Sequence, residues 1–149
     1  QLAKESNAEV VLHNDVVVAD TFSVESNYRI MPLTELKDKG FVMDIGPETL
    51  KLFVSKLNDC KTIVWNGPMG VFEFEQFSNG TRGLAEAIAN IKNVTSIVGG
   101  GSTAEAINKL GLVNAVTHIS TGGGASLEFL EGKDLIGVSK IPEIDILDL

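Results

Sequence analysis

Short apolar runs alternate with polar turns along this chain of 149 residues. The runs are rich in Val and Ile and carry few polar residues, which is typical of strands buried on both faces of a sheet. Turn-forming pairs bound them, as at Asn14-Asp15 and Gly46-Pro47. The pattern predicts strands at Val10–Leu12, Val16–Ala19, Phe41–Ile45, Thr62–Trp65, Thr95–Val98 and Val116–Ile119.

Apolar residues at helical spacing predict helices between and after these strands. The clearest helix begins at Pro47, because proline suits the first helical position. A long stretch from Asn66 to Gly80 has neither the helical nor the strand spacing of apolar residues and is expected to be an irregular loop. The predicted helices are Pro47–Leu57, residues 84–91, Ala104–Leu110 and Ala125–Leu130.

Strand and helix therefore alternate through most of the chain. Such alternation with short connections predicts an α/β fold in which helices flank a parallel sheet, a Rossmann-like three-layer αβα arrangement. Ligands of these sheets bind beyond the carboxyl ends of the strands. The loops that follow the strands at 62–65, 95–98 and 116–119 lie at that edge, so we expect them to line one cleft.

Composition narrows the classes of protein to consider. The apolar content of 44% suffices for one compact core, and the length favours a single domain. The net charge is −8 and the 12 Lys and Arg residues are scattered, so we expect neither a nucleic-acid nor a membrane partner. A single cysteine and two histidines without ligand-like spacing predict no disulfide and no metal ligand. We expect a cytoplasmic protein.

Two triple-glycine turns, Gly99–Gly101 and Gly122–Gly124, each lead from a predicted strand into a predicted helix. The start of a helix leaves about four N–H groups without intrahelical partners and carries a partial positive charge. Glycines let an anion approach these groups closely. The two turns therefore predict binding of phosphate groups.

A structural interpretation of the first turn stays open. Ser102 and Glu105 have the spacing of a capping box, which would explain the serine without a ligand. Gly-x-Gly-x-x-Ala at 99–104 matches the dinucleotide fingerprint formally, but the next predicted strand ends in Ser-Thr at 120–121 rather than in the acidic residue expected there. The sequence also lacks a Walker loop. Nicotinamide, flavin and P-loop enzymes are therefore disfavoured.

Several motifs occur in an order that resembles a known family. They are Asp-x-Gly-Pro-Glu at 44–48, Trp-Asn-Gly-Pro-Met-Gly-Val-Phe-Glu at 65–73, Gly-Gly-Gly-Ser-Thr-Ala at 99–104, Ser-Thr-Gly-Gly-Gly-Ala-Ser-Leu-Glu at 120–128 and Leu-Glu-Gly-Lys at 130–133. Over about residues 16–138, the chain resembles the nucleotide-binding C-terminal domain of the phosphoglycerate kinases.

The resemblance implies a two-domain, hinge-bending enzyme of glycolysis. It would transfer a phosphoryl group between 1,3-bisphosphoglycerate and ADP, giving 3-phosphoglycerate and ATP, with Mg²⁺ bound to the nucleotide. Residues 1–149 match only the later part of the C-terminal domain, so this domain is incomplete here, and the acidic tail at 139–149 is atypical. The lysine-bearing glycine turn and the N-terminal domain that binds 1,3-bisphosphoglycerate and 3-phosphoglycerate have no counterpart. We expect the chain alone to be inactive and the complete enzyme to be a monomer.

The resemblance also assigns residues to the nucleotide. An apolar edge contributes to the adenine pocket, a carboxylate binds the ribose hydroxyls, and an asparagine and the first glycine turn contact the phosphates. Without the resemblance, burial in the core would be the better interpretation of Met43 and Val71. The nucleotide-binding residues would be Phe41, Val42, Met43, Asn66, Gly67, Pro68, Val71, Glu73, Gly100, Gly101, Ser102 and Thr103. The catalytic groups would be the backbone N–H groups of Gly122, Gly123 and Gly124, facing the phosphoryl group in transfer.

Ser102 departs from the family pattern, which usually has an aspartate that helps to hold the magnesium of the nucleotide. A neutral hydroxyl is a much weaker partner for a hard cation. Because Mg²⁺ can be held largely by phosphates, the serine need not abolish binding. It does leave open an alternative function, a noncatalytic adenine-nucleotide-binding or interaction module that has lost the metal chemistry.

Overall fold

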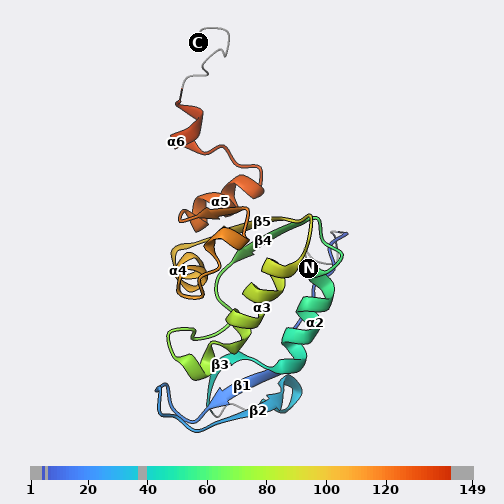
Figure 1. Cartoon of the computed structure of the whole chain (residues 1–149), viewed down its shortest axis with the longest axis vertical. Coiled ribbons are helices and arrows are strands. Elements are labelled where there is room, and N and C mark those ends of the chain that lie inside the picture. Colours follow the sequence, from blue (N-terminus) through green and yellow to red (C-terminus); the bar gives the residue numbers. More distant parts are fainter. Residues whose placement is uncertain (1–4, 6, 37–39, 142–149) are drawn as a thin grey trace.

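The computed structural model describes residues 5, 7–36 and 40–141, which form two three-stranded sheets at opposite ends of a pair of helices (Figure 1). The first sheet is antiparallel, with the strand order β2-β1-β3, and the second is parallel, with the order β4-β5-β6. The strands are β1 (Asp15–Ala19), β2 (Tyr28–Pro32), β3 (Phe41–Ile45), β4 (Thr62–Asn66), β5 (Thr95–Gly99) and β6 (His118–Ser120).

Helices α2 and α3 pack side by side between the two sheets, and α5 lies on the opposite side of the parallel sheet from α3 (Figure 1). The helices are α2 (Pro47–Leu57), α3 (Asn79–Asn90), α4 (Gly101–Lys109), α5 (Gly123–Leu130) and the short α6 (Ile136–Ser139). The 3-10 turns are η1 (Leu33–Glu35), η2 (Glu75–Phe77) and η3 (Val113–Ala115). None of the helices in the described part of the chain has the length and apolarity needed to cross a membrane.

The main core lies between one face of the parallel sheet and the helices that cover it. Ile63 and Trp65 of β4 are buried there with side chains of α3 and α4. Because successive side chains of a strand point to opposite faces, Val64 faces the α5 side, where it remains 40% exposed. The α/β class with helices on both faces of a parallel sheet is therefore confirmed for this half of the chain.

The strand predictions for the first 45 residues need correction. Val16–Ala19 and Phe41–Ile45 form strands, but they belong to the antiparallel sheet rather than to the parallel one. Val10–Leu12 forms no strand in the described structure, and Val10 and Leu12 are exposed. A strand needs a ladder partner, and apolar content alone does not supply one. The prediction omitted β2, whose side chains are mostly exposed and so show no continuous apolar run.

The antiparallel sheet contains a bulge that buries two neighbouring side chains. The register between β1 and β3 shifts so that Val17 pairs with Asp44 and Val18 pairs with Val42, which leaves Met43 as the extra residue. Met43 and Asp44 are consequently both buried, at 1% and 2% exposure, although neighbours on a regular strand point to opposite faces. The bulge turns the Asp44 carboxylate into the protein.

Helices α4 and α5 begin earlier than predicted, so the last glycines of the two turns belong to the first helical turns. Helix α4 begins at Gly101 and α5 at Gly123, each one residue after an N-cap glycine. The predicted capping box is wrong, because Ser102 lies in the first turn of α4 and no side chain caps this helix. The Glu105 carboxylate instead forms an ion pair with Lys109 one turn later, at 2.9 Å. Of the acidic tail at 139–149, only residues 139–141 are among the described residues.

Candidate functional site

Three loops meet at the carboxyl edge of the parallel sheet. The register places the ends of the strands side by side, with Asn66 paired to Gly99 and Gly99 paired to Ser120. A Cβ atom built on Gly123 would lie 2.8 Å from the Gly100 Cα and 2.9 Å from the Asn66 Oδ1. The structure therefore brings the asparagine and both glycine turns into direct contact, as the spacing predicts.

The first turn of α4 presents unpaired backbone donors at this edge. The first intrahelical bond runs from the Ala104 N–H to the Gly100 carbonyl, at 3.0 Å, so the N–H groups of residues 101–103 have no helical acceptor. The Gly100 N–H is engaged, because it donates to the Ser120 carbonyl at 2.9 Å. Gly100 thus supplies a left-handed backbone with φ of 91° and a close approach, whereas Gly101 supplies an N–H donor without a helical acceptor.

The first turn of α5 is arranged in the same way. The Ser126 N–H donates to the Gly122 carbonyl at 2.9 Å, so the N–H groups of residues 123–125 have no helical acceptor. The Ser126 hydroxyl also donates to this carbonyl and lies 3.0 Å from the Ser120 hydroxyl. Two helix starts with free donors therefore face one edge, an arrangement suited to oxyanions.

The loop at 66–74, here termed the Asn66 loop, is anchored through its backbone. The Gly67 N–H donates to the Thr103 hydroxyl at 2.8 Å, and its carbonyl accepts from the Trp65 indole at 2.7 Å. The Met69 N–H donates to the hydroxyl of Thr81 at 3.0 Å. Thr103 is only 1% exposed, so the partner that the structure gives its side chain is the loop, rather than the open edge where a phosphate would bind.

The apolar edge expected for adenine is partly inaccessible. The Met43 side chain is buried with Phe77, which matches the core interpretation of this residue, and its carbonyl accepts from the Val71 N–H at 2.8 Å. Phe41 and Val42 on the same strand are about half exposed, at 48% and 51%. The exposed apolar side chains of this strand are thus Phe41, whose ring lies edge-on to Phe22, and Val42 on the other face, and not Met43.

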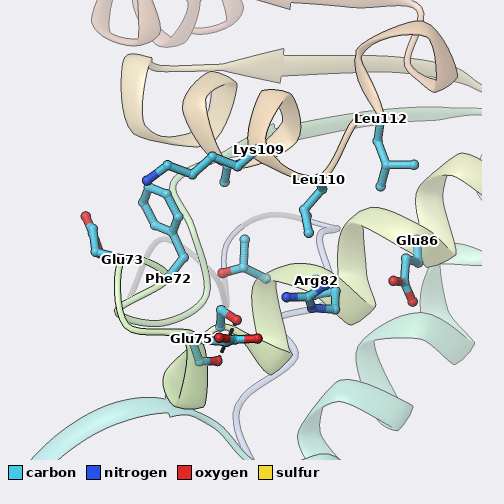
Figure 2. A pocket seen from close by; sticks show the side chains of 11 residues that line it. Phe72, Glu73, Glu75, Arg82, Glu86, Lys109, Leu110 and Leu112 are labelled. Atoms are coloured by element: carbon cyan, nitrogen blue, oxygen red, sulfur yellow. Dashed lines mark hydrogen bonds between the residues drawn. The ribbon is translucent and has the colours of Figure 1, made fainter. Parts of the chain in front are cut away.

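A cavity of about 320 Å³ lies between α3 and the C-terminal end of α4 (Figure 2). In this view Arg82 lies between Leu110 and Glu75, and the Lys109 ammonium lies over the Phe72 ring, 5.1 Å from its centroid. Glu73, expected to bind ribose, is exposed at the rim of this cavity. The charged groups of the lining have both signs, so the cavity does not favour an anion as strongly as the two helix starts do.

Two buried carboxylates accept hydrogen bonds from the first turns of helices. The Asp44 carboxylate accepts from the Gly80 N–H at the start of α3, at 2.8 Å, and from the N–H of Ile45 at 2.8 Å. Burial raises the pKa of Asp44 to about 6, against the opposing effect of these hydrogen bonds. The motif at 44–48 marked this aspartate in the sequence, but nothing in the spacing indicated its burial.

Asp15 is the counterpart at the start of α2. Its carboxylate accepts from the Thr49 N–H at 2.7 Å, from the Thr49 hydroxyl at 2.8 Å and from the Glu48 N–H at 3.2 Å. Burial acts to raise the pKa of Asp15, but the hydrogen bonds from Thr49 and Glu48 outweigh it and hold the pKa below its ordinary value. The two aspartates thus differ in how well hydrogen bonds compensate their burial.

Comparison with known proteins assigns the chain to a family. The family model described as phosphoglycerate kinase matches residues 1–133. The chain belongs to the phosphoglycerate kinase family. Similar relatives include the phosphoglycerate kinase of Prochlorococcus marinus, 47% identical over 145 residues, and the cytosolic phosphoglycerate kinase of Nicotiana tabacum, 49% identical over 138 residues.

Solved phosphoglycerate kinases share the fold. The enzyme from Coxiella burnetii matches with a TM-score of 0.82 at 43% identity over 89% of this chain and 34% of its own. The Pyrococcus horikoshii kinase matches with a TM-score of 0.70 at 36% identity over 83% of this chain and 30% of its own. The matches to the Prochlorococcus and Nicotiana relatives cover 96% and 91% of this chain but only 36% and 34% of the relatives. The chain thus spans about a third of the length of these phosphoglycerate kinases.

The described residues at the carboxyl edge of the parallel sheet offer few ligands for magnesium. Ser102 is exposed in the first turn of α4 and offers one neutral hydroxyl. Across residues 5, 7–36 and 40–141, no three His, Cys, Asp or Glu side chains gather in a way that could hold a metal ion. Magnesium is usually held by one or two carboxylates together with phosphates and waters, and Ser102 supplies a neutral hydroxyl where such a carboxylate would stand.

Proposed function

We propose that the chain forms part of the ADP/ATP site of a glycolytic phosphoglycerate kinase, which moves a phosphoryl group between 1,3-bisphosphoglycerate and ADP to give 3-phosphoglycerate and ATP. The observation that carries the proposal is the contact between Gly100, Gly123 and Asn66 at the carboxyl edge of the sheet. Two helix starts with free N–H donors and one amide side chain converge there. Polyphosphate is the ligand class that suits this arrangement.

In the proposed reaction the N–H groups at the start of α4 hold the phosphates of the nucleotide. The N–H groups of Gly123 and Gly124, with that of Gly122 next to them, face the phosphoryl group in transfer. Charge spread over its oxygens is stabilised by donors that are already oriented. Asn66 donates from its amide without adding charge. Phe41, Val42 and Val71 cover the base, and Glu73 accepts from the ribose hydroxyls.

We assign the binding of the phosphoglycerate substrates to parts of a full-length kinase that this chain does not contain. Because the chain spans about a third of its relatives, we place the binding of 1,3-bisphosphoglycerate and 3-phosphoglycerate on the remainder of a full-length kinase, and we expect the isolated chain to show no turnover. Mg²⁺ arrives as part of the nucleotide substrate, held by its phosphates. Similarity to cytosolic relatives supports a cytoplasmic location, and we expect the full-length kinase to act as a monomer.

Calorimetric titration of the chain with ADP, with and without Mg²⁺, tests the proposal once circular dichroism shows that the chain is folded. We expect binding that Mg²⁺ strengthens and that Gly123→Val abolishes, because a side chain at Gly123 would intrude on the contact with Gly100. A folded chain that binds no ADP under either condition would refute the assignment of the site to this chain.

Ser102 favours one alternative, a noncatalytic nucleotide-binding or interaction module. The same titration separates the two functions, because a module without metal chemistry would bind ADP equally well with and without Mg²⁺. Binding that depends on Mg²⁺ would reject the module and support the kinase.

A further inference from the structure

We propose that Asp44 is a positioning residue whose buried carboxylate fixes the Asn66 loop and the start of α3 in the arrangement that nucleotide binding requires. The inference rests on the proposed function and adds a residue that contacts no nucleotide itself. It follows from the bulge in β3, which turns Asp44 inward at the point where the strand, the loop and α3 meet.

Hydrogen bonds of Asp44 and of its neighbour Met43 connect three segments. One carboxylate oxygen accepts from the Gly80 N–H in the first turn of α3, and the other accepts from the Ile45 N–H on its own strand. The preceding residue, Met43, accepts from the Val71 N–H of the loop. A shift of Asp44 would therefore move the residues that cover the base and, through Thr81 on α3, the bond to the Met69 N–H.

Two glycines show how tightly this carboxylate is enclosed. A Cβ atom on Gly70 would collide with the Asp44 carboxylate and with the Met43 carbonyl. A Cβ atom on Gly80 would collide with the same carboxylate. Both positions thus require glycine, because the backbone of the loop and of α3 is in van der Waals contact with Asp44. The Asp44 carboxylate is therefore enclosed by the Asn66 loop on one side and by the start of α3 on the other.

The ionised form accepts more hydrogen bonds from the loop and helix region, although its burial lowers the stability of the folded chain. An ionised carboxylate accepts at both oxygens, whereas a protonated one turns one oxygen into a donor and so loses an N–H partner on that side. Burial raises the pKa of Asp44 to about 6, so this loss falls in a range that a binding assay can reach. The charged side chains on β1, the Asn66 loop, η2 and α3 are Asp15, Glu73, Glu75, Arg82 and Glu86, and none of the ion pairs among the described residues includes Asp44.

Asp44→Asn tests the role, because the amide has the same shape and only one acceptor oxygen. The matched control is Asp15→Asn, which alters a buried carboxylate at the start of α2 that does not contact the Asn66 loop. In the complete chain, ADP titrations between pH 5 and pH 8 are compared as the ratio of variant to wild-type dissociation constants. The titration of the nucleotide itself cancels in this ratio.

For Asp44→Asn we expect a ratio of about ten at pH 8, from the loss of one charge-assisted hydrogen bond, falling toward one at pH 5 with a midpoint near 6. Asp15→Asn should leave the ratio near one throughout. A flat ratio near one for Asp44→Asn, or equal ratios for both variants, would overturn the proposal.

A second measurement keeps the proposal decidable if Asp44→Asn fails to fold or if the chain binds no ADP. The amide resonances of Gly80 and Val71 in the ligand-free wild-type chain should titrate together, with a midpoint near 6, while that of Thr49 should not. Failure of both Gly80 and Val71 to titrate would overturn the positioning role of Asp44. Titration without ADP binding would instead refute the proposed function of this chain while supporting that role.

Discussion

Gly123→Ala is the perturbation that tests most directly whether the two glycine turns touch. The added methyl group would meet the Gly100 Cα at 2.8 Å, the Asn66 Oδ1 at 2.9 Å and the Gly100 nitrogen at 3.0 Å. Two of these three atoms belong to the backbone, so they cannot rotate away. We therefore expect the turns to be forced apart.

The size of the effect follows from the packing around the methyl group. Overpacking a well-packed position costs about 1–3 kcal/mol. Gly124→Ala is the control, since it adds the same atoms one residue later in α5, where a Cβ would have no neighbour within 4 Å. Alanine is favoured over glycine in a helix by up to about 1 kcal/mol, so this control should be neutral or stabilising.

Urea unfolding followed by circular dichroism measures both variants. We expect the free energy of unfolding of Gly123→Ala to lie about 1–3 kcal/mol below that of Gly124→Ala, because the helical preference for alanine applies to both variants and only the overpacking differs. Equal stabilities would mean that Gly123 and Gly100 are not in contact. The proposed convergence of phosphate-binding donors at this edge would then lose its structural basis.

Three further changes address the loop, the metal and the buried charge. Thr103→Val should cost about 1–3 kcal/mol in urea unfolding, because the Gly67 N–H loses a buried acceptor, and an unchanged stability would contradict this role. Ser102→Asp should add about 0.3–1 kcal/mol to the free energy of unfolding, because a negative charge is favoured in the first turn of α4. It should also increase the gain in ADP affinity that Mg²⁺ gives in calorimetry, whereas an unchanged Mg²⁺ dependence would show that the serine is no defect. The pKa of Asp44 is raised from 3.8 to about 6 in the folded chain, so the native state holds more protons between these values and stability should fall by about 2–2.5 kcal/mol as pH rises from 4 to 7. Asp44→Asn should remove that slope, and identical slopes in urea unfolding at several pH values would refute it.

Local sequence patterns predicted most elements of the parallel half. Pro47 marks the start of α2, and the apolar run at 95–98 lies in β5, because proline geometry and apolar runs act over a few neighbouring residues. The prediction failed for Val10–Leu12 and for β2, where pairing with a distant strand decides the structure. The capping box at Ser102 failed for a related reason, since Gly100 adopts a left-handed conformation that starts the helix earlier.

The same division applies to the candidate site. The motifs around Asn66 and the two glycine turns, together with their resemblance to phosphoglycerate kinases, placed the groups that we propose to bind phosphate at one edge of the sheet. The sequence could not indicate that the Gly100 N–H and the Thr103 hydroxyl already have partners within the protein, or that Met43 is buried. These properties depend on which groups meet across the fold.

By itself, the sequence determined the family, the α/β class of the parallel half and the positions of the glycine turns, because these follow from short motifs and local periodicity. Only the tertiary structure decided that the described residues up to Ile45 contribute an antiparallel sheet, that a bulge turns Asp44 inward, and that Gly70 and Gly80 enclose its carboxylate. Those outcomes depend on strand register and on contacts between distant residues. Neither is encoded in the spacing along the chain.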